Sequence, residues 1–320
     1  FIMPNYQGVW SLSTQYQNAS GWPSPPLTAS DLGILAGGRN SGNTDQNIIQ
    51  YVFIATTGNA NDFGDLSAAG SNMGMTASST RAVFFGGLSR YRTIDFVEMA
   101  SASNATDFGD ISDTTSDYQL TAAGSNTRGV IVGLKNTNSP TNRIDFITIS
   151  SVGDSTDFGN LTVSRGSIGT AGSTTRMVMS GGRNVGTYYN TMDYITIASA
   201  GNATDFGDSD LAGQGMGAVS SSTRAVFGGR FNNSNQNRID YITIASTGNA
   251  ADFGDLTSSR YYVGGMSNKT KGVFAGGDSA TTLMDYVTIA STGNAVDFGD
   301  MTASLSRQND GTGNAHGGLS

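Results

Sequence analysis

The 320-residue chain carries a formal net charge of −8, contains no cysteine, and has 44 glycines but only 13% charged side chains. The absence of cysteine excludes disulfides, thiol catalysis and cysteine-based zinc sites, and the 17 scattered Lys and Arg residues form no basic stripe for nucleic acid. No apolar run approaches the ~18 residues of a membrane-spanning helix, and a surface covered by Gly, Ser, Thr and Asn is typical of an all-β, turn-rich protein.

Residues 1–30 differ in composition from the rest of the chain. They contain both tryptophans, Trp10 and Trp22, and a proline cluster at 23–26 that does not suit a buried strand, because proline has no backbone N–H. We interpret this segment as a neck that joins a domain at 31–320 to a partner. The first residue is Phe rather than Met, so we expect a segment of a longer chain.

An internal repeat follows the neck. The tripeptide Asp-Phe-Gly occurs six times at intervals of 45 to 50 residues, and two further blocks recur with it, one ending in Gly-Gly and one reading hydrophobic-Asp-aromatic. A protein kinase needs Asp-Phe-Gly once, together with His-Arg-Asp, and the only histidine here is His316. The motif therefore belongs to a repeating architecture. Its copies begin at Asp62, Asp107, Asp157, Asp205, Asp252 and Asp297.

Each repeat contains four predicted strands. In the fifth copy, residues 224–227 run into Gly-Gly, residues 239–244 form a β-branched and aromatic strand that is apolar on both faces, and residues 251–256 form a short strand with Phe253 as its anchor. The segment 261–266 precedes the next repeat and is rich in small residues, as expected close to a crowded axis. Four strands in a unit of about 47 residues match one blade of a β-propeller.

The count of strands predicts how the ring closes. Residues 33–66 supply three strands of the first blade, and the proline cluster before Gly33 cannot supply the innermost one. After the sixth outer strand the chain adds a surplus innermost segment at 307–316. We therefore predict an all-β, six-bladed propeller with four-stranded blades, in which a C-terminal strand completes the first blade and removes the exposed sheet edges.

The repeat resembles the kelch repeat over roughly residues 30–316. Arg165, Arg260 and Arg307 fall where kelch repeats often carry an Arg that opens the innermost strand, and Phe stands where the usual Trp would be. More narrowly, IDYITIASTGNAADFGDLT at 239–257 resembles kelch-like repeat proteins of marine bacteriophages. The resemblance implies a kelch-like β-propeller in a tail fibre or other virion-associated protein. The six Phe residues are Phe63, Phe108, Phe158, Phe206, Phe253 and Phe298.

A basic residue and an aspartate recur together in five repeats. In the first repeat both are missing, since Leu32 and Gln50 stand in their places. We interpret this joint loss as a sign that the two side chains form ion pairs across neighbouring strands or blades, because a buried charge left alone is costly. The proposed structural pairs are Arg81 with Asp95, Arg128 with Asp145, Arg176 with Asp193, Arg224 with Asp240, and Lys271 with Asp285.

The sequence favours no catalytic chemistry. His316 is the lone histidine and Glu98 the sole glutamate, and nearly every aspartate is accounted for by the repeat. In the Asp-Phe-Gly-Asp motif we expect Phe to fill a pocket between blades, Gly to permit a bend, and the carboxylates to accept hydrogen bonds from turn N–H groups. Calcium bound by these clustered oxygens is the alternative. We predict no catalytic residue, no cofactor and no dedicated metal site.

The segments between the Gly-Gly strand and the next strand differ from repeat to repeat. They span 39–47, 88–93, 135–143, 183–191, 230–238 and 278–283, and should all lie on one rim of the ring. Variable loops on a uniform scaffold are where recognition is usually found, although drift in unconstrained loops is the alternative. The candidate recognition residues are Asn40, Ser89, Arg90, Tyr91, Asn136, Asn184, Tyr188, Tyr189, Phe231, Asn232 and Asn235.

The resemblance sets the functional expectation. It implies an extracellular virion structural protein, namely a propeller head on a tail fibre or similar appendage that binds a glycan or protein on the host surface. We expect the neck to contact other virion proteins and the chain to form a homo-oligomer, namely a trimer. Nucleic acid is not an expected partner. The alternatives are a passive capsid or tail decoration or assembly protein, and a secreted bacterial adhesin.

Overall fold

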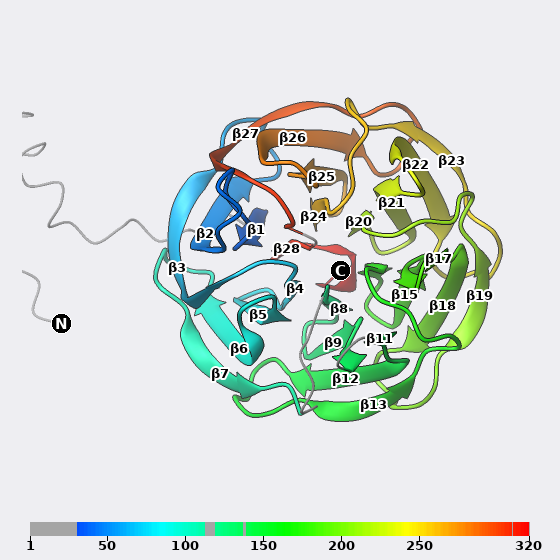
Figure 1. The fold of residues 1–320 in the computed structure, drawn as a ribbon, viewed down its shortest axis with the longest axis horizontal. Coiled ribbons are helices and arrows are strands. Elements are labelled where there is room, and N and C mark those ends of the chain that lie inside the picture. The colour runs from blue at the N-terminus through cyan, green and yellow to red at the C-terminus, as the bar shows by residue number, and fades with distance from the viewer. Residues whose placement is uncertain (1–30, 113–118, 137–138, 309, 320) are drawn as a thin grey trace, which may run out of the picture.

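The chain forms a six-bladed β-propeller (Figure 1). The computed structural model describes residues 31–112, 119–136, 139–308 and 310–319. Within these ranges, six four-stranded antiparallel sheets surround a central axis, and two short hairpins extend blades 3 and 4. The predicted neck at 1–30, with Trp10 and Trp22, lies outside the described residues.

The blades follow one another in chain order, and each runs from an innermost to an outermost strand. Blade 1 comprises β28 (Thr312–Gly313), β1 (Leu32–Ala36), β2 (Gln46–Phe53) and β3 (Asn61–Gly70). Blade 2 comprises β4 (Gly74–Ala77), β5 (Arg81–Gly87), β6 (Tyr91–Glu98) and β7 (Thr106–Asp110). Blade 3 comprises β8 (Thr121–Gly124), β9 (Arg128–Val132), β12 (Arg143–Thr148) and β13 (Thr156–Asn160), with the hairpin β10 (Lys135–Asn136) and β11 (Ser139–Pro140).

The second half of the ring repeats this order. Blade 4 comprises β14 (Gly169–Gly172), β15 (Arg176–Ser180), β18 (Thr191–Thr196) and β19 (Thr204–Asp208), with the hairpin β16 (Arg183–Asn184) and β17 (Thr187–Tyr188). Blade 5 comprises β20 (Gly217–Ser220), β21 (Arg224–Phe231), β22 (Asn235–Thr243) and β23 (Ala251–Asp255). Blade 6 comprises β24 (Gly264–Ser267), β25 (Lys271–Ala275), β26 (Thr281–Thr288) and β27 (Val296–Leu305), and the short 3₁₀ helix η2 (Gly317–Leu319) follows β28.

The predicted closure of the ring is confirmed. Strand β28 pairs antiparallel with β1, so that Gly313 lies opposite Gly33 and Thr312 opposite Ile34. The C-terminus therefore provides the innermost strand of blade 1. In Figure 1 the red end of the chain reaches the centre of the ring beside the blue first blade.

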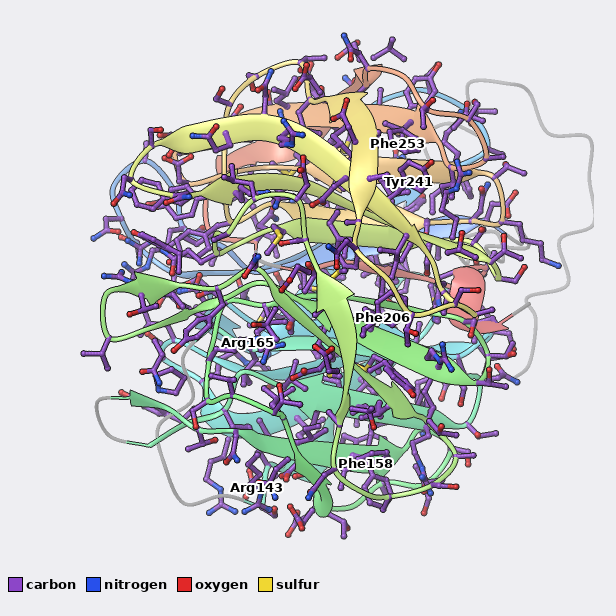
Figure 2. All side chains as sticks on the ribbon, turned by 90° about the vertical axis from the view of Figure 1, so that its right-hand side faces the viewer. Arg143, Phe158, Arg165, Phe206, Tyr241 and Phe253 are labelled. Atoms are coloured by element: carbon purple, nitrogen blue, oxygen red, sulfur yellow. The ribbon has the colours of Figure 1, made fainter. Side chains whose placement is uncertain are left out.

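Apolar side chains fill the spaces between blades rather than forming one central core. Each buried cluster combines residues of two neighbouring sheets; at the closure, Leu35, Val52 and Ile54 of blade 1 pack with Val273 and Phe298 of blade 6. A single blade buries little apolar surface by itself, so each blade depends on both neighbours. Figure 2 shows Phe158, Phe206 and Phe253 on three successive outer strands.

The innermost strands have the small residues that the axis requires. Strands β4, β8, β14, β20 and β24 read GMTA, TAAG, GTAG, GAVS and GGMS. Together with β28 they make six strands that converge on the centre. Larger side chains at these positions would collide across the axis. Within the described ranges, no helix has the length and apolar character that a membrane span requires.

Candidate functional site

The six Asp-Phe-Gly motifs join the outer strands of neighbouring blades. Each Phe is 2–3% exposed, and its ring meets the edge of the aromatic side chain on the preceding strand, as Phe158 does with Phe146 at a centroid distance of 5.9 Å. Each Gly has a positive φ, between +137° and +149°. A Cβ on Gly159 would lie 2.3 Å from the carbonyl oxygen of Gly201 in the next blade. Glycine is therefore required for close approach of two backbones.

The N–H that follows each motif is capped by the next blade. The backbone N–H of Asp208 donates to Oδ1 of Asn249 at 3.0 Å, and the same contact recurs around the ring up to Asp300 and Asn59 at the closure. The first Asp of each motif is exposed. The expectation that the motif carboxylates accept the turn N–H groups is therefore wrong for this contact, because the acceptor is a side-chain oxygen of the neighbouring blade.

The predicted Arg–Asp pairs are wrong in their partners. The strand register places Arg224 opposite Thr243, whereas Asp240 lies opposite Phe227, three positions away. An offset of three residues is about 10 Å along a strand and puts the two side chains on opposite faces. The same offset separates Arg81 from Asp95, Arg128 from Asp145, Arg176 from Asp193 and Lys271 from Asp285.

The strand-opening cations instead connect successive blades. Each lies over the aromatic ring of its own blade, at 4.1–4.5 Å from the centroid, and donates a hydrogen bond to a backbone carbonyl of the next blade. Arg224, for example, lies over Tyr241 and donates to the Ile289 carbonyl at 3.0 Å. Lys271 makes the contact that crosses the closure, to the Ala55 carbonyl at 3.1 Å. These residues hold the ring together.

The five aspartates are buried and pair with arginines from other parts of the repeat. Asp240 accepts from Arg230 at 2.6 Å, and Asp193 accepts from Arg165 at 2.9 Å. Burial raises the pKa of Asp240, against the lowering influence of Arg230. The remaining pairs are Arg90 with Asp95, Arg143 with Asp145, and Arg260 with Asp285.

The arginines that pair with the buried aspartates come from different places in the chain. Arg165 and Arg260 come from the crossover before an innermost strand, as the kelch resemblance implies, whereas Arg230 and Arg90 come from the segment after Gly-Gly. Arg90 was a candidate recognition residue, and this prediction is wrong: its side chain is fully buried against Asp95. Arg307 does not occupy the place of Arg165, because it lies two residues farther from the preceding Phe.

Blade 1 replaces the buried ion pair with neutral groups. Gln50 stands in the place of the aspartate, and its Oε1 accepts from the backbone N–H and the hydroxyl of Thr302, each at 2.7 Å. Thr302 belongs to blade 6, so this contact also crosses the closure. The joint absence of the basic residue and the aspartate, replaced by Leu32 and Gln50, therefore reflects two separate replacements at the closure rather than the loss of one pair.

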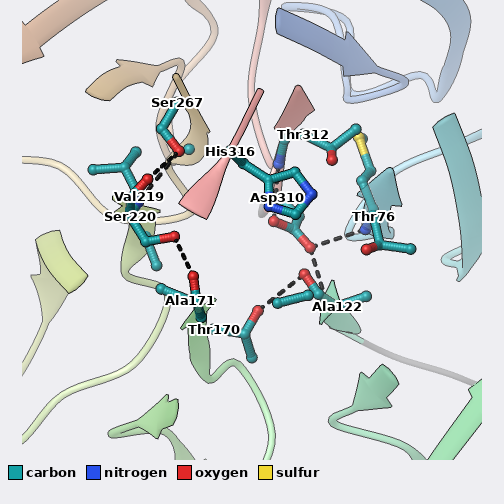
Figure 3. Close-up of a pocket in the computed structure, with 16 residues that line it drawn as sticks. Thr76, Ala122, Thr170, Ala171, Val219, Ser220, Ser267, Asp310, Thr312 and His316 are labelled. Atoms are coloured by element: carbon teal, nitrogen blue, oxygen red, sulfur yellow. Dashed lines mark hydrogen bonds between the residues drawn. The ribbon is translucent and has the colours of Figure 1, made fainter. Parts of the chain in front are cut away.

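The C-terminal segment closes the axis of the propeller. The carboxylate of Asp310 accepts from the backbone N–H groups of Met75 in blade 2, at 2.9 Å, and Ala122 in blade 3, at 2.8 Å (Figure 3). Burial raises the pKa of Asp310 to about 8, although these N–H groups act to lower it. The surrounding cavity of about 40 Å³ is lined by the innermost strands. It has room for only a few water molecules.

His316 is a packed residue of the same segment. Its Nδ1 accepts from the Gly318 N–H, so its Nε2 carries the proton and donates to the Ala77 carbonyl, both at 3.0 Å. Burial lowers the pKa of His316, and the imidazole is neutral. Among the described residues, no group of three or more His, Asp or Glu side chains is arranged to hold a metal ion.

The variable segments lie together on the rim where strands turn from the Gly-Gly strand to the next strand. Tyr91 is 55% exposed. Asn40 accepts from the Thr44 N–H within its own loop, whereas Asn184 donates to the Ser164 carbonyl in the crossover between β13 and β14. Asn136 lies in β10, and Asn232 accepts from Asn233.

Aromatic residues from three blades meet on this rim. Tyr188 of blade 4 contacts Phe231 of blade 5 with ring centroids 5.9 Å apart, and Phe231 contacts Tyr261 at 4.9 Å. Tyr261 stacks on Tyr262 at 4.3 Å. We call Tyr188, Phe231 and Tyr261, which are each partly exposed, the rim cluster. Tyr188 and Phe231 are predicted recognition residues, whereas Tyr261 is predicted in an innermost strand. That prediction is wrong for Tyr261, because β24 begins only at Gly264 and Tyr261 lies in the crossover before it.

Polar groups surround the rim cluster. Arg183 lies over the Tyr188 ring at 5.4 Å, and Nδ2 of Asn235 donates to both carboxylate oxygens of Asp278 at 3.1 Å. Burial and Asp278 raise the pKa of Tyr261.

No protein-family model and no curated protein matches this chain.

Proposed function

We propose that this chain is a non-enzymatic virion structural protein, the kelch-like propeller head of a bacteriophage tail fibre or similar appendage, and that its variable rim binds a receptor on the host surface. The observation that carries the proposal is the rim cluster. The buried charges of the repeat are engaged in pairing and inter-blade contacts, whereas Tyr188, Phe231 and Tyr261 form a partly exposed aromatic surface. Partly exposed aromatic residues are typical of binding surfaces.

The placement in a virion is supported by the resemblance of the repeat to kelch-like proteins of marine bacteriophages. A rigid propeller that presents variable loops on one rim is suited to recognition, but the fold by itself supports only a binding platform. We propose that residues 1–30 attach the propeller to other virion proteins and that the chain acts as a homo-oligomer, with three copies as the simplest fibre symmetry.

A labelling experiment tests receptor binding. The full chain, carrying a fluorophore, should stain susceptible bacteria and leave resistant mutants of the same strain unstained. Tyr188→Ala with Tyr261→Ala should abolish staining, whereas Tyr91→Ala, which removes an exposed aromatic side chain from another blade on the same rim, should preserve it. Absence of staining would favour a passive decoration or assembly protein.

A second measurement tests the placement. Mass spectrometry of purified particles should find the chain in virions, with the propeller visible on a tail appendage after labelling with a specific antibody. Detection in the medium of uninfected bacteria, with none in particles, would favour a secreted bacterial adhesin instead.

A further inference from the structure

The rim cluster has more polar character than an apolar contact surface needs. Phe231 and Tyr261 are tilted by 41° and Tyr188 and Phe231 by 63°, so the three rings form a curved surface rather than a flat one. Tyr188 comes from hairpin β16–β17, Phe231 from the end of β21, and Tyr261 from the crossover before β24. A ligand on this surface would therefore touch three blades.

Two guanidinium groups lie beside these rings. Arg183 is exposed and contacts the Tyr188 ring, and Arg307 is partly exposed, with its backbone N–H bonded to the Gly277 carbonyl next to Asp278. Gly277 also lies against Arg260, the residue before Tyr261, because a Cβ on Gly277 would be 3.2 Å from the Arg260 Cβ. The backbone of Arg307 and the crossover that carries Tyr261 therefore flank the same segment. Among the described residues, neither guanidinium makes an ion pair, whereas arginines elsewhere in the ring are engaged in buried or inter-blade contacts.

Hydroxyl and carboxylate groups complete the surface. The Tyr261 hydroxyl makes no hydrogen bond to any described residue. Asp278 is held by the Asn235 amide, which leaves its carboxylate oriented and still able to accept further hydrogen bonds, since a carboxylate has about four acceptor positions. The rim therefore combines aromatic faces, two cations that form no ion pair with a described residue, one phenol donor and one fixed acceptor.

We propose that the rim cluster binds an acidic sugar residue of a surface polysaccharide, with the sugar ring against the aromatic side chains, its carboxylate on Arg183 and Arg307, and a ring hydroxyl on Asp278. A sugar presents an apolar C–H face and a hydroxyl edge, which match the aromatic and polar parts of the cluster. The two cations on a chain of net charge −8 favour a carboxylated sugar over a neutral one. The inference rests on the proposed receptor-binding function and names its ligand class.

Binding to defined saccharides tests the proposal. The probes are oligomers of galacturonic, glucuronic and mannuronic acid together with sialyllactose, each compared by titration calorimetry with its carboxyl-reduced neutral form. The full chain should bind at least one acidic probe about tenfold more tightly than the reduced form, because charge-assisted hydrogen bonds are worth about 1.5 kcal/mol or more. Arg183→Gln with Arg307→Gln should remove that preference, and Tyr261→Phe should weaken binding severalfold.

A matched control separates the site from general charge effects. Arg176→Gln removes one positive charge and one cation–π contact at the inter-blade junction of blade 4 and should leave saccharide affinity unchanged. Equal affinity for acidic and reduced probes, no binding of any acidic probe, or equal losses in the control and site variants would each overturn the proposal. Bacteria that are stained by the chain although no acidic probe binds would overturn this inference while leaving receptor binding intact, and would indicate a protein receptor.

Discussion

Arg230 and Asp240 form a fully buried ion pair within blade 5, with Nη2 of the arginine 2.6 Å from Oδ1 of the aspartate. The arginine lies at the end of β21 and the aspartate in β22, and the N–H of Asp210, in the crossover from blade 4, also donates to the carboxylate at 3.2 Å. The pair thus fixes one blade to the chain that enters it. Removal of either member would leave the other charged and buried.

A double-mutant cycle measures this relationship. Asp240→Ala alone should lower the free energy of unfolding by about 3–5 kcal/mol, and the double variant with Arg230→Leu should be less destabilised than the sum of its parts by about 1–3 kcal/mol. Chemical denaturation of the wild-type chain, the two single variants and the double variant gives the coupling free energy. The control cycle pairs Asp240→Ala with Arg224→Leu, whose effects should add, because those side chains face opposite sides of the sheet. Coupling with Arg224 instead of Arg230 would contradict the assignment.

The fold could be predicted because its signals are local or periodic. The spacing of Asp157, Asp205 and the other copies indicates the blade length, and the proline cluster before Gly33 together with the surplus segment near Thr312 indicates the closure. Both the blade length and the closure can be read from short segments. The strand content of each segment and the missing N–H of proline are local properties of the sequence. The burial of the repeated Phe residues was also predictable, since a large apolar side chain that recurs in every short outer strand is stabilised by burial between blades.

The partners across strands could not be predicted in the same way. The register of a hairpin depends on its loop, and the segments after Gly-Gly differ in length and contain bulges, as between Gly228 and Arg230. One slipped position moves a side chain to the other face of the sheet. Only two of the three members of the rim cluster could be identified from the sequence, for a related reason. Tyr261 is far from Tyr188 in the sequence, and its contact with Phe231 arises from the path of the crossover between blades.

Gly159 provides a test of the contact between outer strands. Gly159→Ala should destabilise the propeller by about 2 kcal/mol or more, because the backbone has a φ of +149° and the added Cβ would meet the Gly201 carbonyl at 2.3 Å. Thermal unfolding gives the difference. Gly201→Ala is the matched control: a Cβ there has no atom within 4 Å, and stability should change by less than about 0.5 kcal/mol. Equal losses for the two variants would exclude the proposed role of the glycine.

Arg224 tests the contribution of the strand-opening cations. Arg224→Met should lower the free energy of unfolding by about 1–2 kcal/mol, since it removes a cation–π contact with Tyr241 and a charged hydrogen bond to the Ile289 carbonyl. Arg183→Met serves as the comparison, because Arg183 is exposed and its distance from the Tyr188 ring is 5.4 Å. Chemical denaturation should show little change for this variant. A loss as large as that of Arg224→Met would show that the inter-blade hydrogen bond is not the source of the effect.

Asp310 and His316 should make the closure of the ring depend on pH in opposite directions. The pKa of Asp310 is raised from 3.8 to about 8, so its stabilising contribution is fully present below about pH 4 and is lost as the pH rises to about 8. The pKa of His316 is lowered from 6.5, so its contribution is present above pH 6.5 and is lost at lower pH. As the pH rises from 6.5 to 8, His316 becomes neutral in the unfolded state as it already is in the folded state, and Asp310 dominates this pair.

The free energy of unfolding, measured from pH 6.5 to 8, isolates the contribution of Asp310. The wild-type chain should lose stability from pH 6.5 to 8 with a slope of at most about 1.4 kcal/mol per pH unit, which corresponds to one proton released on unfolding. Asp310→Asn should have lower stability, because the amide nitrogen faces the Gly311 N–H, but a flatter profile in the same interval. His316→Gln, which can still accept from the Gly318 N–H and donate to the Ala77 carbonyl, should keep the wild-type slope above pH 6.5 and flatten the profile below it. An unchanged slope in Asp310→Asn would mean that the carboxylate is ionised in the folded propeller, held by its three backbone N–H donors.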